Sequence, residues 1–462
     1  MSFSHGAAMF SARVFRLASM LGFGPAAGFA MLVYLASAAP AAAIGLLRDA
    51  GVEHGLSELA APVLRSAGLS PTRVKVLVVD DGKLNAFVID GQTIFVNHGL
   101  IQKVQSAEML QAVIAHEAAH IANGHIARRM GNMRSARTVA GLGTALAVVA
   151  AAAGAGQAAG GIAIGSASSA YRSFLSHTRA EEAAADRSAA SFMRNGGVDP
   201  QGLVELHRAF AGQEALSVGR QDPYMQSHPL TRDRIRAAEA FVASIGSAAE
   251  PNPEADYWFA RVRGIISAFT RAPGWTLQRA PEESAADIRL MREAIAYHRQ
   301  NDLARALTAI DGALAIRPDD AYYHDLKGQF LIENRKMDAA VAAYATAVSL
   351  APGDALILGG YGRALLAAGQ PKAALAQLEK ARSRDFRDLR VLRDLGQAYA
   401  ETGQDGMAAT ATAERYALQG RLEDAAIHAR RAERLLPRGS AAWQRAQDVL
   451  IAAEQAEKRK KK

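Results

Sequence analysis

The 462-residue chain contains no cysteine. This absence excludes disulfide frameworks, thiolate zinc fingers, iron–sulfur ligation and cysteine nucleophiles, so any bound metal must be held by His, Asp or Glu. Aromatic residues are scarce, at 6%, and no basic stripe is interleaved with them, although the net charge is +8. We therefore expect no nucleic-acid partner. Because 50% of the residues are hydrophobic and 21% are charged, the chain is predicted to form two or three globular domains.

Charged residues are missing between Arg16 and Arg48. An apolar run from about Leu17 to Leu35 is followed by small residues that include Ala41–Ala43. This order is typical of a secretory signal peptide cut after an A-x-A pattern, so residues 1–43 are predicted to be a signal peptide. An uncleaved membrane anchor is the alternative, because the run is long enough to span a bilayer. Both interpretations place the rest of the chain outside the cytoplasm.

A second uncharged stretch runs from Thr138 to Tyr171 and is rich in alanine and glycine. It is long enough to cross a membrane, but its Gly154–Gly165 part is a poor helix former. We expect an apolar flap over a substrate cleft, which touches membrane or unfolded substrate. A true membrane span is the alternative.

A period of 34 residues marks the C-terminal half of the chain. The residues that share this register are Pro318 and Pro352; Gly328, Gly362 and Gly396; and Ala306, Ala340, Ala374 and Ala408. This period is typical of tetratricopeptide repeats, whose small residues let two helices approach closely. About four repeats are predicted, the last of them less regular and ending near Pro437. Such a solenoid has a groove suited to extended or helical peptide segments.

The catalytic centre is predicted on a helix from Ala107 to Asn123, which contains the string His116-Glu117-Ala118-Ala119-His120. Two histidines four residues apart lie on one helix face, so both can bind one zinc ion. Glu117 lies beside the metal without binding it, and there it can take a proton from the attacking water and pass it to the leaving amine.

A third ligand is needed, and the best candidate lies on a second helix around residues 179–187. Glu182 can bind the zinc ion, while Asp186, one turn later, accepts the second N–H of a ligand histidine. Ordinary surface carboxylates are the alternative interpretation of this pair. His125 is one residue short of the position a metzincin would use for its third histidine, and we expect it to be a core or supporting residue.

Two short strands are predicted around Val74–Val79 and Phe87–Val96, with a turn at Asp90-Gly91. A small sheet with a free edge beside the zinc helix could hold an extended peptide by main-chain hydrogen bonds.

Several motifs resemble those of the HtpX and BepA group of zinc metallopeptidases. They are His116–His120, Glu182 with Asp186, Asn85–Phe87, Val96–Leu100 and Ser227–Leu230. This resemblance covers nearly the whole chain after residue 43.

The resemblance implies that His116, His120 and Glu182 bind one zinc ion and that Glu117 is the catalytic base. It also implies that His228 occupies the fourth zinc position and holds the enzyme in check, since a fourth protein ligand displaces the water that the reaction needs. The residues alone support His228 less well, because a His-Pro pair in a loop is often only part of a turn. The implied substrates are misassembled outer-membrane proteins, and the implied partner is the outer-membrane barrel assembly machinery.

The sequence thus predicts an α+β zincin-like metallopeptidase domain, mostly helical with a small sheet, at residues 44–250. An all-α tetratricopeptide-repeat solenoid with its own core is predicted at 254–457, and the basic tail 458–462 is a solvated end or contacts anionic lipid. The expected activity is that of a periplasmic zinc metalloendopeptidase of the gluzincin type, peripheral to the outer membrane, which degrades misassembled outer-membrane proteins and assists their assembly. The alternative is a chaperone or assembly factor whose proteolysis is held off.

Overall fold

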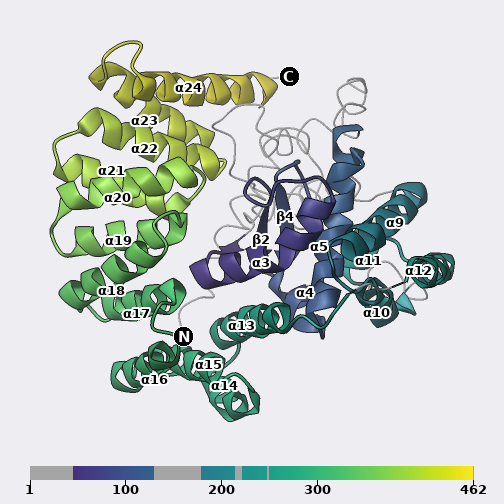
Figure 1. Ribbon diagram of the computed structural model, residues 1–462. Helices are drawn as coiled ribbons and strands as arrows, with labels where there is room; N and C mark the ends of the chain where they lie inside the picture. Colours follow the sequence, from purple (N-terminus) through teal and green to yellow (C-terminus); the bar gives the residue numbers. More distant parts are fainter. Residues whose placement is uncertain (1–44, 129–177, 214–220, 247–248, 461–462) are drawn as a thin grey trace, which may run out of the picture. The chain divides into compact units, whose positions relative to one another are not determined.

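The computed structural model describes residues 45–128, 178–213, 221–246 and 249–460 (Figure 1). The predicted signal peptide and the uncharged stretch 138–171 lie outside the described residues. Within them helices dominate and the strands form one small sheet, as predicted. None of the helices in this part of the chain is both long and apolar enough to cross a bilayer.

The sheet contains four strands in the order β1-β2-β4-β3. They are β1 (Leu46–Leu47), β2 (Lys75–Val79), β3 (Ala86–Val88) and β4 (Thr93–Asn97). β2 and β4 are parallel, and the other two pairs are antiparallel. The predicted turn at Asp90-Gly91 is confirmed: it joins β3 to β4, and Asp90 accepts a hydrogen bond of 2.8 Å from the backbone N–H of Gln92. β1 was not predicted, because two residues show no alternation of apolar and polar side chains. Among the described residues, β3 is the last strand of this order.

The described part of this half also contains seven helices, of which α3, α4 and α5 contact the sheet. They are α3 (Ala50–Ser66), α4 (His98–Lys103), α5 (Ala107–Ala122), α9 (Arg179–Asn195), α10 (Gln201–Phe210), α11 (Pro223–Ser227) and α12 (Arg232–Ile245). The predicted helix at 107–123 is confirmed as α5, which begins where the Ser106 side chain accepts a hydrogen bond from the N–H of Met109. α5 is buried from Met109 to His120 and packs against α3, α9 and α10. Its polar residues are therefore enclosed by protein.

The C-terminal half is a succession of helices. They are α13 (Pro253–Thr270), α14 (Pro273–Arg279), the 3-10 helix η3 (Ala280–Glu282), α15 (Ala286–Arg299), α16 (Leu303–Ile316), α17 (Ala321–Glu333), α18 (Met337–Leu350), α19 (Ala355–Ala367), α20 (Pro371–Arg384), α21 (Leu389–Glu401), α22 (Asp405–Leu418), α23 (Leu422–Leu435) and α24 (Ala441–Lys460). Consecutive helices pair as antiparallel hairpins (Figure 1). A Cβ atom on Gly328 would lie 2.7 Å from the Tyr344 ring, and one on Gly362 would lie 2.5 Å from Leu378. The repeated glycines therefore make room for a bulky side chain of the partner helix.

Aspartates also follow the 34-residue period, and the sequence analysis did not include them. Asp320, Asp354 and Asp388 are the N-cap residues of α17, α19 and α21. Each side chain accepts hydrogen bonds from backbone N–H groups of the first helical turn. Loss of such a cap typically lowers the stability of the protein by about 1 kcal/mol. The repeat therefore specifies where each hairpin begins as well as how its helices pack.

The last unit is irregular, as predicted. α22 forms a hairpin with α21 and also packs against α23 and α24. Its inner face carries alanines, and Ala413 and Ala417 meet Ala429 of α23 and Ala446 of α24 in a small core of their own. One helix is therefore shared between two units.

The prediction that the whole repeat domain has a separate core is wrong for its first helices. One continuous cluster of buried apolar residues extends from α3 and α5 through α13 to α17. A Cβ atom on Gly55 of α3 would lie 2.6 Å from Val262 of α13. Val262 is 0% exposed, and Ile265 and Ile266 are also buried. The sequence break at Pro251-Asn252-Pro253 starts a helix, but it does not separate two hydrophobic cores.

We therefore expect truncation after Asn252 to unfold the N-terminal half, whereas truncation after Pro352 leaves its core intact. Burial of each large apolar side chain contributes about 1.5–3 kcal/mol, and a domain is stable by only about 5–15 kcal/mol. Thermal unfolding followed by circular dichroism, together with metal content, measures the difference. A chain ending at Asn252 that unfolds at the temperature of the full chain would contradict the shared core.

Candidate metal centre

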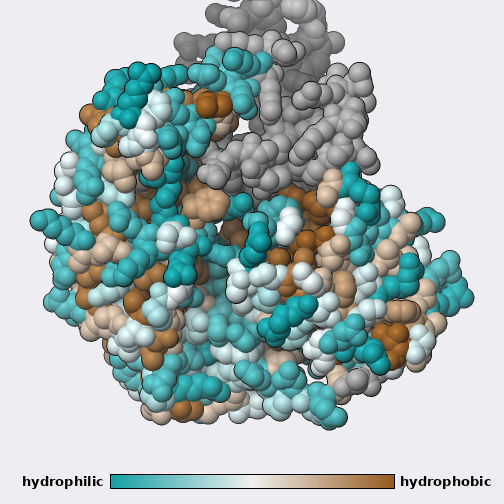
Figure 2. All heavy atoms as spheres, turned by 45° about the horizontal axis from the view of Figure 1, so that its top comes forward, coloured by the Kyte–Doolittle hydropathy of each residue, from teal (hydrophilic) through white to brown (hydrophobic). Residues whose placement is uncertain are grey.

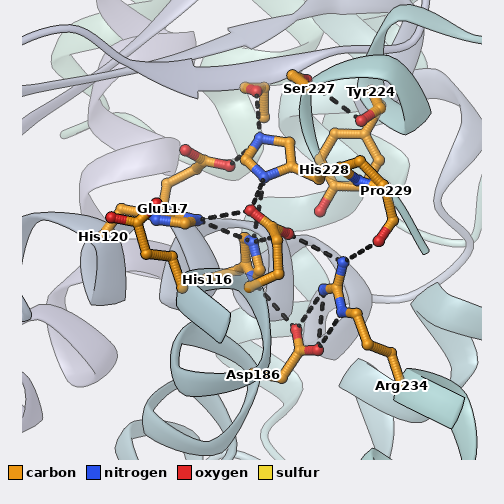
Figure 3. Close-up of polar contacts among 12 residues, drawn as sticks. His116, Glu117, His120, Asp186, Tyr224, Ser227, His228, Pro229 and Arg234 are labelled. Carbon is orange, nitrogen blue, oxygen red and sulfur yellow. Dashed lines mark hydrogen bonds and ion pairs between the residues drawn. The ribbon is translucent and has the colours of Figure 1, made fainter. Parts of the chain in front are cut away.

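α5 presents His116, Glu117 and His120 to the interior (Figure 3). Their exposed fractions are 1%, 0% and 0%. The Nε2 atoms of His116 and His120 lie 3.1 Å apart, as the four-residue spacing predicts for one helix face. Both oxygens of Glu117 are buried, and neither has a hydrogen bond within the described part of the chain.

α9 brings Glu182 and Asp186 against this helix. α9 begins at a capping box, in which the Thr178 side chain and Glu181 bond reciprocally to each other's backbone N–H. Glu182 is 0% exposed, and its two oxygens lie 3.4 Å from Nε2 of His116 and 3.4 Å from Nε2 of His120. The alternative that this carboxylate lies on the surface is therefore excluded.

His228 follows the last residue of α11, and it is 2% exposed. Its Nδ1 atom lies 3.3 Å from Nε2 of His116 and 3.1 Å from Oε1 of Glu182. Its Nε2 atom lies 3.3 Å from Oε1 of Glu117 and 3.3 Å from the carbonyl oxygen of Ala86 in β3. The ring thus contacts the candidate ligands, the candidate base and the sheet edge (Figure 3).

These donor atoms lie close enough together to bind one metal ion. One donor atom from each of His116, His120, Glu182 and His228 lies within 4.8 Å of the others. The separations quoted above, which involve both oxygens of Glu182, are 3.1–3.4 Å. Donors at about 2.0–2.1 Å from a central zinc ion stand about 3.3–3.4 Å apart at the corners of a tetrahedron. The orphaned oxygens of Glu117 beside this cluster suit a base that acts on a water molecule.

Asp186 and Arg234 contact the candidate ligands from outside the cluster. Oδ1 of Asp186 lies 3.1 Å from Nδ1 of His116, although the angle departs from a good hydrogen bond. Arg234 of α12 donates two hydrogen bonds to Asp186, at 2.8 and 2.9 Å, and a third, at 2.8 Å, to the carbonyl of Pro229. Its Nη1 atom also lies 2.9 Å from Oε2 of Glu182. Arg234 thus ties one candidate ligand and one supporting carboxylate to the residue that follows His228.

Two further histidines complete the surroundings. His125, expected to be a core or supporting residue, is buried with its Nδ1 atom 2.8 Å from Nδ1 of His120. His207 of α10 lies 3.4 Å from Asp186. No sequence motif marks His207 or Arg234 as part of the site. The Arg232-Asp233-Arg234 run has the composition of an exposed helix start, and only the fold shows that its last residue is buried.

Burial controls protonation in the cluster. It raises the pKa of Glu117, against the opposing effect of His228 and His116. Burial favours the neutral ring of His116, but contacts with Asp186 and Glu182 outweigh it and raise the pKa of this histidine to about 10. A cation bound here would compete with that proton, so its affinity should rise with pH. The raised pKa of Glu117 suits a group that accepts and returns a proton near neutral pH.

Replacing Arg234 by glutamine is expected to destabilise the protein by about 3–5 kcal/mol, because two buried carboxylates lose their compensating charge. Arg236 provides a matched control two residues later, since its side chain is 74% exposed and its partner Asp233 is 89% exposed. Replacing Arg236 by glutamine should change stability by only about 0–1 kcal/mol. Urea unfolding of both variants, each measured with and without chelator, tests this. Equal losses in the two variants would contradict the role of Arg234.

Comparison with known proteins agrees with this geometry. The model of Peptidase family M48 matches residues 47–242, and a tetratricopeptide-repeat model matches residues 331–395. The Beta-barrel assembly-enhancing protease of Escherichia coli (strain K12) is 24% identical over 385 residues, which are 82% of this chain and 78% of that protein. Metalloprotease LoiP of the same organism is 31% identical over 173 residues, which are 36% of this chain and 61% of that protein.

A solved structure titled "MamA 41-end from Desulfovibrio magneticus RS-1" aligns with 35% of this chain and 93% of its own, at 22% identity. Its TM-score of 0.31 is too low to add to the description of the fold. The M48 match, in contrast, includes His116, His120, Glu182 and His228. The chain is therefore a metalloprotease with a Peptidase family M48 domain at residues 47–242, followed by tetratricopeptide repeats.

Proposed function

We propose that this metalloprotease is a zinc-dependent endopeptidase of the bacterial cell envelope, which degrades misassembled outer-membrane proteins and assists their assembly. The observation that carries the activity is the buried cluster of His116, His120, Glu182 and His228, whose donor atoms lie within 4.8 Å of one another. Zinc is the metal that suits three imidazoles and one carboxylate in this geometry.

His116, His120 and Glu182 would hold the zinc ion, which would supply a Lewis acid to polarise the scissile carbonyl and to make water more acidic. Glu117 takes the proton of the attacking water and returns it to the leaving amine, and its buried, raised-pKa carboxyl suits both steps. Asp186 holds the ring of His116 in position through Nδ1.

Substrate binding is assigned to the edge strand β3. On the described part of the chain this strand pairs with β4 on one side, while the Ala86 carbonyl on it faces His228. An extended segment could pair with this edge through its main chain, so that little of its sequence is read. Unpaired strands of misassembled β-barrel proteins have this chemistry. The name of the Escherichia coli relative supports the same class of substrate.

The repeats and the chain start supply the cellular context of the proposal. The solenoid would recruit substrates or the outer-membrane barrel assembly machinery, since repeats of this kind bind peptide segments. The predicted signal peptide at residues 1–43 would place the protein in the periplasm, with peripheral contact to the outer membrane.

A second candidate function is that of a chaperone or assembly factor whose proteolytic activity is inhibited by His228, which we call the latch. The position of His228 favours it, because this residue occupies the fourth corner of the cluster and contacts the base as well. A site closed by four protein ligands leaves no corner for water. The two candidates differ in turnover and share the same fold.

The purified protein tests the proposal directly. Metal analysis should find one zinc ion per chain, and the protein should cleave casein or an unfolded porin. A chelator should abolish cleavage, and added zinc should restore it. A zinc-loaded protein that cleaves neither substrate, but prevents the porin from aggregating, would favour the chaperone.

Glu117→Gln is expected to keep zinc and lower cleavage by about 10²–10⁴-fold, because an amide cannot accept the proton of water. Glu108→Gln, in the first turn of the same helix, is the matched control and should leave both unchanged. His116→Ala, His120→Ala and Glu182→Ala should lower zinc content itself. Loss of zinc in the Glu117→Gln protein would contradict its role as the base.

His228→Ala should leave zinc bound by the other three ligands and increase cleavage or self-cleavage, because a corner opens for water. Cleavage per bound zinc measures the effect. The decisive control is the double variant His228→Ala, Glu117→Gln, in which the excess cleavage should vanish. Excess degradation that persists in the double variant, or activity that falls in step with stability in the single one, would contradict the latch.

A further inference from the structure

The outward side of α23 combines aliphatic and cationic residues. The opposite side of this helix packs Ala425, Ala429 and Ala432 into the core of the last unit. On the outward side Ile427 is 62% exposed and Leu435 is 51% exposed, and both are among the most exposed large apolar residues of the described chain. An apolar side chain that stays in water contributes no burial energy to folding. The exposure of these two residues therefore suggests that this side of α23 contacts another surface.

Four exposed arginines accompany these two residues: Arg430, Arg431, Arg434 and Arg438. None of them has an ion pair to a carboxylate in the described ranges. Elsewhere in the solenoid arginines are paired, as Arg363 is with Asp394 and Arg382 with Glu414. We define the α23 face as Ile427, Arg430, Arg431, Arg434, Leu435 and Arg438.

Two acidic residues lie at the start of the helix, where Asp424 is paired with Arg421 at 2.7 Å and Glu423 lies in the first turn. From Ile427 to Arg438 the charged side chains are four exposed arginines and one half-buried carboxylate, Glu433, so cationic groups predominate on this face. Three of these arginines fall within five residues of one helix, so their charges act together.

We propose that the α23 face docks on the surface of a bilayer that carries anionic phosphate headgroups. Guanidinium groups bind phosphate oxygens in a bidentate manner, and neighbouring aliphatic side chains can enter the boundary between headgroups and acyl chains. The α23 face is one side of a single helix, and such a side can contact a broad surface such as a membrane. An acidic peptide is usually bound in a groove between elements. Figure 2 shows hydrophilic residues with isolated hydrophobic ones among them over the C-terminal helices at the upper left.

This surface specifies the peripheral membrane contact of the proposed function and rests on it for its cellular setting. It needs no proteolysis, so the two proposals can fail separately. Membrane binding is measured with vesicles, and cleavage is measured with casein in solution.

The test uses the processed protein and measures flotation with vesicles of phosphatidylcholine alone or with about one third phosphatidylglycerol. The wild type should bind the anionic vesicles at low salt, bind the neutral ones far less, and lose binding at high salt. The variant Arg430→Gln, Arg431→Gln, Arg434→Gln should bind roughly 100-fold more weakly, at about fivefold for each arginine. Ile427→Ser, Leu435→Ser should also weaken binding while its salt dependence remains.

Lys336→Gln, Lys372→Gln, Lys380→Gln is the matched control, since it removes three exposed charges from other helices and turns of the solenoid. It should bind like the wild type, and all variants should keep wild-type circular dichroism, zinc content and casein cleavage. Equal loss of binding in both triple variants would show an effect of net charge alone and overturn the proposal. Vesicle binding that persists in the arginine variant would also overturn it. So would arginine-dependent binding to polyglutamate without vesicle binding, because this result would assign the face to an acidic protein.

Discussion

The burial of charge between α5 and α9 constrains most of the N-terminal half. Glu117, Glu182 and Asp186 have almost no access to water, and moving a carboxylate out of water is costly unless opposite charges and hydrogen bonds compensate it. The compensation comes from four separate segments: the histidines of α5, His207 of α10, His228 after α11, and Arg234 of α12. The fold must therefore bring these four segments to α9 before the charges can be buried, and a metal ion would add the remaining positive charge.

In the proposed function, His228 would block two positions that a substrate needs. Its Nδ1 atom lies beside His116 and Glu182, and its Nε2 atom lies 3.3 Å from the Ala86 carbonyl on β3. Water must reach the first position during hydrolysis, and a peptide that pairs with β3 must approach the second. In the proposed latched state one ring blocks both, so a segment that displaces it from β3 also opens the metal corner. Pro229, held by Arg234, fixes the adjacent backbone and limits how far this loop can move.

The parts that the sequence predicted are those set by local periodicity. The helix of His116 and His120, the helix of Glu182 and the 34-residue hairpins all depend on neighbours close in the chain, so spacing alone places them. Arg234 and His207 were missed because their burial depends on contacts with Asp186, some 48 and 21 residues away. The shared core of α3 and α13 was missed for the same reason. The roles of the individual site residues stay predictions until zinc content and cleavage are measured.

α13 couples the repeats to the metal-binding half, because one of its faces packs on α3 and another begins the helical array. Arg261 of this helix is 1% exposed and pairs with Asp320, which also caps α17. A buried guanidinium that loses its partner is strongly unfavourable, so this pair holds the first hairpins rigidly to α13. The later hairpins have small clusters of alanine and leucine of their own, but the turn between α20 and α21 also contacts the N-terminal half. Asp385 pairs with Arg48 at 2.7 Å, and Arg387 lies 3.7 Å from Asp90. Movement of the first helices must therefore disturb α3 and the core that supports α5, and movement of α20 and α21 must break these ion pairs.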